Sequence, residues 1–343
     1  MGEGIQTKNG KAFEYACVKA LVKMLNLYGE IKISESSPLL TARNLYLEMD
    51  EKMKDQLDKA ADAAVRVVYK LEPQLWSSNG NEPLIIEIQT DASGIKGDVR
   101  DVVCLRKQND WQIGFSCKHN HHAVKHSRLS DTIDFGKEWL GVPCSKNYFS
   151  EVVPLFEELR RYRDESKKNG KPMLWEEIEN KAERFYKPIL SAFIKELERI
   201  TETNSGIPEK LIHYLLGKND FYKVITDDKN RTTKIEAINI SGTLNRESGN
   251  DKSIAMIPIL KMPTRFFYMG FKKDSDNTIE VICDEGWQIS MRIHNASSKV
   301  EPSLKFDVQL ISFPSSVYVQ VEPWDSYYDL LEKRLSSYTK KNT

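Results

Sequence analysis

The order in which helical and strand patterns occur constrains the fold of this chain most, because two long helices are predicted before any strand. Apolar residues spaced three and four apart in residues 11–28 indicate an amphipathic helix, and good helix formers predict a second helix over about 43–72. Short β-branched runs bounded by Gly, Asp and Asn then predict strands at 84–89, 101–105 and 111–118. This order of helices and strands favours an α/β (α+β) fold.

The rest of the chain divides into a helical block and a strand-rich block. Residues 151 to about 217 have mixed-charge helical periodicity, with a break at the KKNGKP turn. After residue 220 the pattern changes to β-like runs separated by turn residues, among them TTKIEAINI, SIAMIPILKM, RFFYMGF and SVYVQVE. We therefore expect a first domain over 1–150, a helical insertion over 151–219 and a sheet-rich lobe over 220–343.

Composition excludes several classes of protein. The chain has 343 residues, of which 40% are apolar and 29% charged, so neither disorder nor a fibrous repeat fits. Fifty basic residues balance fifty acidic ones, so affinity for a polyanion must come from local clustering. The sequence contains no apolar run of the roughly 18 residues that a membrane helix needs, and a cytoplasmic location is expected. The five cysteines are scattered and predict neither a disulfide framework nor a cysteine zinc site.

The predicted strand at 111–118 places a lysine on its polar face. Alternate residues from Trp111 to Cys117 form one apolar face, so Lys118 faces the other side. Asp101 opens the preceding strand, just after the turn that holds Asp98, and two adjacent strands could hold Asp101 and Lys118 in one site. Such a pair suits metal-assisted phosphodiester cleavage, in which a carboxylate binds Mg²⁺ and a lysine orients water and neutralises transition-state charge. The alternative is a turn-capping aspartate and a solvated edge lysine.

The segment after Lys118 is basic and rich in neutral hydrogen-bond donors. It has no acid before Asp131, and a nucleic-acid backbone suits this surface. The candidate DNA-binding residues in this segment are Asn120, His121, His122, Lys125, His126 and Arg128. The histidine cluster from His119 to His126 also permits a zinc site, although no suitably spaced carboxylate or thiol would complete it.

These segments resemble a known family. The stretches GDVRDVV and WQIGFSCKHNHHAVKHSRLSDTIDFGKEWLG are similar to the HaeIII family of type II restriction endonucleases, which belong to the PD-(D/E)XK nuclease superfamily. The resemblance extends back to GKAFEYA and forward to GWQISMRIHNASSKVEPSLKFDVQL, so it covers most of the chain. It implies a mixed β-sheet flanked by helices, and Mg²⁺-dependent cleavage of double-stranded DNA at GGCC. It also implies a companion DNA methyltransferase, a genetic partner that protects the host's own sites.

The resemblance assigns the catalytic residues. Asp101 matches the first acidic position of the superfamily, with Asp98 as its nearest rival, and Lys118 matches the lysine. The first domain would then be the nuclease core, and the sheet-rich lobe the DNA-recognition part.

One position departs from the superfamily pattern. The residue two before the lysine is normally Asp or Glu, but it is Ser116 here, so another carboxylate must complete the metal site. Glu14, on the first predicted helix, resembles the glutamate that many superfamily members project into the site. The expected Mg²⁺ ligands are therefore Asp101 with Glu14 or Asp98. The alternative for Glu14 is a solvated glutamate paired with Lys11 three residues earlier.

Two basic stretches of the third part are candidates for reading DNA sequence. They contain Arg265 among aromatic residues, and Arg292, His294, Asn295 and Lys299 in a run without acids. Arginine binds the O6 and N7 acceptors of guanine bidentately, so Arg292 is the leading candidate reader. Its structural alternative is a cross-strand ion pair.

Two other functions remain open from the sequence. The serine at position 116 is compatible with a catalytically inactive DNA-binding protein of the same fold, which an assay for cleavage with Mg²⁺ would identify. The histidine cluster leaves a zinc-dependent enzyme as a second alternative, which metal analysis would identify.

Overall fold

The computed structural model describes residues 2–77, 82–90, 97–120, 123–125, 127–168, 170–249 and 251–325, apart from the side chains of 2–6 and 123–125. It contains two compact units. The first unit comprises Met1–His122, Asn219–Leu260 and Ser316–Thr343. The second comprises Ala123–Lys218 and Lys261–Ser315.

The first unit is built around a sheet that takes strands from both ends of the chain. Its strands lie in the order β1-β2-β3-β4-β7-β8-β13. Their bounds are β1 Ile31–Ile33, β2 Leu84–Ile88, β3 Val102–Arg106, β4 Trp111–His119, β7 Phe221–Asp227, β8 Thr232–Ile238 and β13 Tyr318–Pro323. The β1–β2 and β4–β7 pairs are parallel and the others antiparallel, which confirms the mixed sheet.

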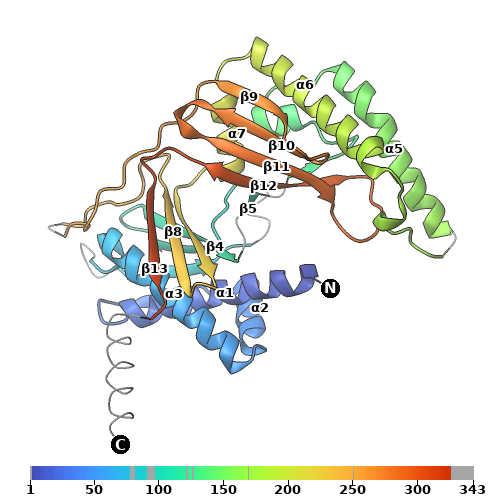
Figure 1. Cartoon of the computed structure of the whole chain (residues 1–343). Helices are drawn as coiled ribbons and strands as arrows, with labels where there is room; N and C mark the ends of the chain where they lie inside the picture. The colour runs from blue at the N-terminus through green and yellow to red at the C-terminus, as the bar shows by residue number, and fades with distance from the viewer. Residues whose placement is uncertain are drawn as a thin grey trace, which may run out of the picture. The chain divides into compact units, whose positions relative to one another are not determined.

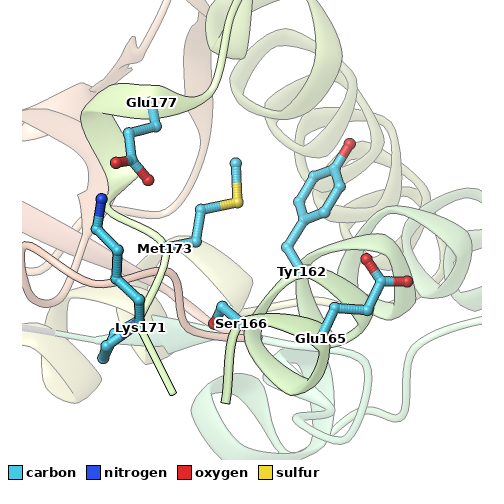
Figure 2. Close-up of a pocket in the computed structure, with 7 residues that line it drawn as sticks. Tyr162, Glu165, Ser166, Lys171, Met173 and Glu177 are labelled. Carbon is cyan, nitrogen blue, oxygen red and sulfur yellow. The ribbon is translucent and has the colours of Figure 1, made fainter. Parts of the chain in front are cut away.

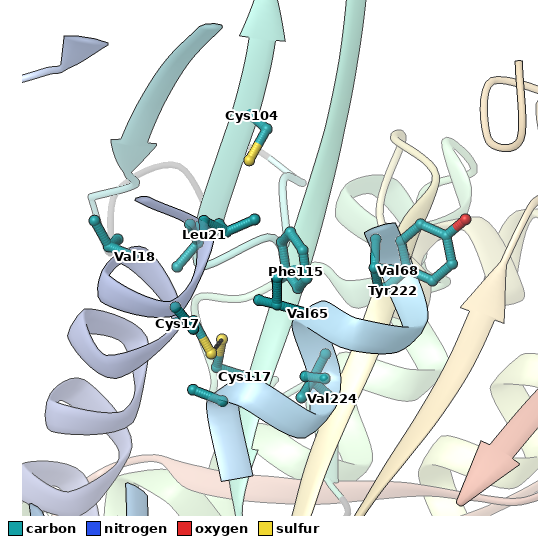
Figure 3. Packing of buried hydrophobic residues seen from close by; sticks show 14 of the residues in the cluster. Cys17, Val18, Leu21, Val65, Val68, Cys104, Phe115, Cys117, Tyr222 and Val224 are labelled. Carbon is teal, nitrogen blue, oxygen red and sulfur yellow. Dashed lines mark hydrogen bonds between the residues drawn. The ribbon is translucent and has the colours of Figure 1, made fainter. Parts of the chain in front are cut away.

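Helices cover one face of this sheet. They are α1 (Gly2–Leu25), α2 (Ser37–Leu47) and α3 (Glu51–Leu71), followed by the short turn η1 (Pro73–Leu75). Helix α1 contacts β4, and α3 contacts β7 and β8 (Figure 1). Figure 3 shows the core between them, with Cys17 of α1 and Val65 of α3 facing Phe115 and Val224 of the sheet. The predicted fold class, a mixed sheet flanked by helices, is therefore confirmed.

The polar face of the sheet follows from the same alternation. Phe115 and Cys117 of β4 are buried in the core, so Ser116 and Lys118 between and after them face the opposite side. This face carries the candidate site.

The second unit has its own sheet and three longer helices. The strands lie in the order β5-β12-β11-β10-β9, and β6 also pairs with β12. Their bounds are β5 Ala123–Lys125, β6 Arg128–Leu129, β9 Phe266–Phe271, β10 Thr278–Cys283, β11 Gln288–Asn295 and β12 Leu304–Ser312. The helices are α5 Lys146–Lys168, α6 Lys187–Thr203 and α7 Ile207–Leu216, with short helical turns η2 Gly136–Leu140, η3 Trp175–Glu177, η4 Ala182–Tyr186 and η5 Asp284–Gly286.

The chain passes between the units more than once, unlike the consecutive three-part division expected from the sequence. The first unit takes β7, β8 and β13 from the part expected to form a separate C-terminal lobe. Strand β7 pairs with β4, which precedes it by about a hundred residues. Such a long-range pairing leaves no local pattern in the sequence.

Two local expectations also differ from the structure. The single helix expected over 43–72 is two helices, because the Asp50 carboxylate accepts a hydrogen bond from the Met53 N–H at 2.8 Å and starts α3 anew. The run SIAMIPILKM forms no strand, and Ile254 and Met256 within it are exposed. No helix in the described part of the chain is both long and apolar enough to cross a membrane.

Candidate active site

Asp101 is held where the β3–β4 ladder ends. Its N–H donates to the carbonyl of Phe115 at 2.7 Å, and its own carbonyl accepts the N–H of Gln89 at 2.9 Å. The carboxylate oxygen Oδ2 accepts the N–H of Cys117 at 2.7 Å. Backbone groups of β4 and of Gln89, just after β2, therefore fix the position of this acid.

Lys118 contacts the same carboxylate oxygen of Asp101. Its Nζ lies 3.3 Å from Oδ2 of Asp101, and the two side chains are 22% and 24% exposed. The structure therefore contains the predicted contact between Asp101 and Lys118, and both side chains are partly exposed to solvent, where a substrate can reach them.

Glu14 is the second carboxylate near this pair. It lies on α1 and is 5% exposed. Burial, together with the negative charge of Asp101, raises the pKa of Glu14 to about 8, while Lys11 and Lys118 act in the opposite direction. The pair with Lys11 that was expected as an alternative also forms, at 3.2 Å, but Glu14 is buried and not solvated. Glu14 is thus within electrostatic reach of both Asp101 and Lys118.

Asp98 is engaged elsewhere. Its two oxygens accept hydrogen bonds from Nε and a terminal nitrogen of Arg100 at 2.8 and 2.7 Å. Burial raises the pKa of Asp98, but the Arg100 hydrogen bond and charge outweigh it and hold the value below the usual range. Asp98 is therefore a structural partner of Arg100, whereas Glu14 is close enough to Asp101 for the charge of Asp101 to raise its pKa.

Ser116, which stands where the superfamily pattern has Asp or Glu, lies beside two charged residues that were not candidates from the sequence. Ser116 is opposite Lys223 of β7, and Lys223 is opposite Glu236 of β8. All three are about 3% exposed. Burial lowers the pKa of Lys223 to about 8, against the charge of Glu236 and together with that of Lys118. The residues FYKVITD around Lys223 form a central strand, and its alternation could have drawn attention to this lysine.

The chemistry of the acids suits a hard cation. In the part of the chain that the structure describes, no three His, Cys, Asp or Glu side chains are grouped as a metal site. Asp101 and Glu14 offer two carboxylates, which is the number of protein ligands that Mg²⁺ commonly takes alongside phosphate and water.

The histidine cluster is only partly described. His119 is buried, and its Nε2 lies 3.2 Å from Oδ2 of Asp228. His121, His122 and His126 lie outside the described residues. The Asn120 side-chain amide donates to Oδ2 of Asp228 at 2.8 Å, and its oxygen accepts the N–H of Asp228 at 3.1 Å. Both the nitrogen and the oxygen of this side chain therefore bind Asp228.

The basic candidates of the second unit lie at its surface. Arg128 is exposed and donates to Oγ of Ser303 at 3.2 Å. Arg265 has a 71% exposed side chain and stacks over the ring of Phe267 at 4.8 Å. For Lys125 the structure describes the backbone in β5, and the side chain lies outside the description.

Arg292 forms the cross-strand ion pair that was its structural alternative. It is opposite Asp307, and its guanidinium lies 3.3 Å from Oδ2 of that residue while the side chain stays 55% exposed. Next to it, His294 is opposite Lys305, which in turn is opposite Arg128, so three basic residues form a row across the sheet. Lys305 was missed from the sequence because its neighbours include Asp307.

Asn295 is the last residue of β11, and Lys299 lies in the loop that follows this strand. The Asn295 side chain donates to the carbonyl of Ser297, so a local contact engages it. Lys299 is exposed, and its N–H donates to Oγ of Ser297 at 3.2 Å. Lys299 is thus the more accessible of the two.

A pocket of the second unit contains none of these residues. It has a volume of about 300 Å³ and is lined by Tyr162, Glu165, Lys171 and Glu177 among others (Figure 2). The Glu177 carboxylate is already used to accept the N–H of Leu174 at 2.9 Å. The pocket is therefore separate from the candidate active site.

The fold and the site together define a class of enzyme. A mixed sheet flanked by helices, with Asp101 and Lys118 in contact and Glu14 nearby on the first helix, is consistent with a restriction-type nuclease. The model of the HaeIII restriction endonuclease family matches residues 10–314. The chain is also 40% identical over 318 residues to the type II restriction enzyme HaeIII of Haemophilus aegyptius, which covers 92% of this chain and 98% of that enzyme.

The chain belongs to the HaeIII restriction endonuclease family. It is a homologue of a type II restriction enzyme and thus a site-specific endonuclease. No solved structure matches the chain significantly.

Proposed function

We propose that this endonuclease hydrolyses phosphodiester bonds of double-stranded DNA at GGCC and needs Mg²⁺ to do so. The observation that carries the proposal is the contact of Lys118 with Asp101 at 3.3 Å, with the Glu14 carboxyl within reach of both charges. The target GGCC comes from the family resemblance.

The residues of the site fit Mg²⁺. Burial and the charge of Asp101 disfavour ionisation of Glu14, and a bound cation would remove this penalty. Asp101 and Glu14 would hold the ion. When bound, Mg²⁺ would neutralise charge on the phosphate and make bound water more acidic.

Lys118 and Asp101 would have different roles in the reaction. Lys118 would donate to a phosphate oxygen and stabilise the charge that builds up as water attacks phosphorus. Asp101 keeps Nζ of Lys118 in place through Oδ2, and the Cys117 N–H prevents that oxygen from turning away. The strand backbone thus preorganises the acid and the lysine before DNA binds.

DNA recognition is proposed for the basic surface of the second unit. Arg128 and Lys305 would bind phosphates, and Arg292 would exchange Asp307 for guanine. The other candidates, including the three histidines outside the described residues, stay predictions.

The cellular setting is part of the proposal. A companion DNA methyltransferase would protect the host's own GGCC sites, and both enzymes would act in the cytoplasm. The partner is genetic, and no physical contact with this chain is proposed.

Cleavage of short duplexes tests the function. We expect a duplex with GGCC to be cut in the presence of Mg²⁺, and duplexes with one base pair of the site changed to stay intact. EDTA should abolish the cleavage. Binding without any cleavage would instead support a catalytically inactive DNA-binding protein, and activity that follows bound zinc would support the histidine cluster.

A further inference from the structure

A glutamate of the second unit shares a sheet face with Arg292, the proposed guanine-binding residue. Arg292 of β11 is opposite Thr278 of the neighbouring strand β10, and Glu280 follows Thr278 by two residues, so all three side chains lie on one face (Figure 1). Such diagonal positions of an antiparallel pair are about 7–8 Å apart, within reach of long side chains. Ile279 and Met291 lie on the opposite face and are buried. Glu280 and Arg292 therefore face away from this core.

The face that carries Glu280 and Arg292 is open to solvent. Helix α6 packs on the opposite face, where the ring of Phe193 lies 5.4 Å from that of Phe306 on β12, measured between centroids. Phe306 is opposite Ile293, whose side chain points away from that of Arg292. On the polar face the side chain of Arg292 is 55% exposed and that of Glu280 is 23% exposed. A ligand can therefore reach both groups from solvent.

The contacts of Glu280 within the protein are weak. Its Oε1 lies 3.9 Å from Nζ of Lys272, a half-exposed side chain, and an ion pair of this kind contributes little to stability. Among the residues that the structure describes, none forms a hydrogen bond with the Glu280 side chain. Asp307, an acid of the same face, is only 8% exposed and already pairs with Arg292. Glu280 is thus the more accessible hydrogen-bond acceptor of the two.

We propose that Glu280 recognises cytosine in GGCC by accepting a hydrogen bond from its N4 amino group in the major groove, while Arg292 binds guanine. This inference rests on the proposed function and deepens it. Each base pair of GGCC presents two acceptors on guanine and one donor on cytosine in that groove. A carboxylate repels phosphate, so its acceptor atoms suit a donor at a base edge and not the DNA backbone. A donor and an acceptor on one face of the sheet thus match both kinds of group in the target.

Binding to duplexes that lack one cytosine amino group tests this role. Pyrimidin-2-one lacks the N4 amino group, and it replaces either the first or the second cytosine of GGCC on both strands of two duplexes. A third duplex carries the analogue outside GGCC and measures the effect of the weaker base pair alone. Affinities for these and the native duplex are measured in EDTA with the wild type, Glu280→Met and Lys272→Met. Lys272→Met is the matched control, since it removes the cation beside Glu280 but not the acceptor.

The expected results form a cycle. At one of the two positions, loss of the amino group should weaken wild-type binding about tenfold or more, as for one charge-assisted hydrogen bond, whereas the analogue outside GGCC should not. Glu280→Met should bind the native duplex about tenfold more weakly and lose its sensitivity to the analogue at that position. Lys272→Met should keep all of that sensitivity, and Glu280→Gln, which retains one acceptor oxygen, part of it. The same penalty in Glu280→Met as in the wild type would overturn the proposal, as would a wild type without any penalty.

Discrimination against thymine provides an independent check. Thymine has the acceptor O4 where cytosine has its amino group, so the Glu280 carboxylate should repel it. Replacing the recognised G·C pair by A·T should therefore weaken binding about tenfold less in Glu280→Met than in the wild type. Unchanged discrimination in Glu280→Met would contradict the proposal. Failure of the wild type to cut GGCC duplexes would remove the proposed function as well, whereas cleavage with an unchanged analogue penalty in Glu280→Met would remove only the role of Glu280.

Discussion

At the scale of single residues, Asp101 and Lys118 could be placed together from the sequence alone. Strand alternation and one short hairpin suffice, because the two residues are only seventeen positions apart. Lys223 could not be placed, because its neighbour Ser116 lies on a strand distant in the sequence. The Arg100 contacts that engage Asp98 were also hidden, since a strand pattern says nothing about which cation an acid will bind.

Glu14 is expected to be the second metal ligand. Glu14→Gln removes a charged oxygen donor but keeps the shape of the side chain, so the Mg²⁺ concentration for half-maximal cleavage should rise about tenfold or more. A Mg²⁺ titration of the cleavage rate measures this. Glu30→Gln, at an exposed acid of the same unit, is the control and should leave the requirement unchanged. If the requirement of Glu14→Gln were also unchanged, Asp98 would become the candidate.

Gly114 allows Arg100 to pack across β4. A Cβ at this position would lie 2.2 Å from Cδ and 2.8 Å from Cβ of Arg100, so the arginine would have to leave. We expect Gly114→Ala to lower the free energy of unfolding by about 1–3 kcal/mol and to slow cleavage, because the Asp98–Arg100 pair lies next to Asp101. Urea unfolding measures the first effect.

Gly10→Ala is the matched control for this prediction. Gly10 lies in α1, and a Cβ there would meet nothing within 4 Å. The substitution should raise stability by up to about 1 kcal/mol, since alanine is the better helix former. Equal stability of Gly114→Ala and the wild type would show that Arg100 has room to move.

At the scale of elements, the sequence predicted whether a segment is a helix or a strand better than it predicted where the element ends or which strand it pairs with. The start of α3 depends on one cap, Asp50, within a stretch whose helical pattern is continuous. The SIAMIPILKM run has strand-forming residues but no strand partner in the structure. Periodicity reports which residues share a face, and pairing depends on segments elsewhere in the chain.

Glu72 joins the end of α3 to β7. The Tyr222 hydroxyl and the Asn245 N–H each donate to its Oε1 at 2.7 Å, and Oε2 has no hydrogen-bond partner among the described residues. Burial raises the pKa of Glu72 from 4.5 to about 8, against these hydrogen bonds. The folded state therefore holds this proton more tightly than the unfolded state, and the resulting stability is present below pH 4.5 and lost as the pH rises to about 8.

Glu72→Gln should remove this pH dependence. The variant should gain stability relative to the wild type between pH 5.5 and 8.5, by an amount on the order of a few kcal/mol. Urea unfolding of both proteins at the two pH values measures the gain. Glu51→Gln, at the 90% exposed first residue of α3, should give no such gain. A constant difference between wild type and Glu72→Gln would contradict the expectation.

Substitutions on the sheet of the second unit test how the protein recognises the DNA sequence. Arg292→Ala should cost about 1–3 kcal/mol of binding to GGCC duplexes and relax discrimination against changed sites. Arg128→Ala should weaken binding to all sequences alike and lower the salt slope by about one. Equal losses on cognate and random DNA for Arg292→Ala would leave it as the structural partner of Asp307 alone.

At the scale of the whole molecule, the class of fold was predictable and the division of the chain was not. Each unit is assembled from separate segments, and β13 near the end of the described chain completes the sheet that β1 begins. The sequence shows consecutive blocks because helical and strand patterns are local. The contacts that join β4 to β7 and β8 to β13 are not local.

The first unit carries the acids and lysines of the site, and the second carries the exposed basic surface proposed to bind DNA. Binding and cleavage should therefore be separable by mutation. Substitutions of Asp101 or Lys118 should affect cleavage, and substitutions on β6 and β11 should affect binding.

The most direct measurement compares cleavage and binding in Asp101→Asn. Single-turnover cleavage of a GGCC duplex with Mg²⁺ and affinity for the same duplex in EDTA are measured for this variant and the wild type. We expect cleavage to fall by at least about a thousandfold while the affinity stays within about threefold, because the change removes the proposed metal ligand and a partner of Lys118 but no proposed DNA-binding group. Near-native cleavage by Asp101→Asn would contradict the assignment of the active site.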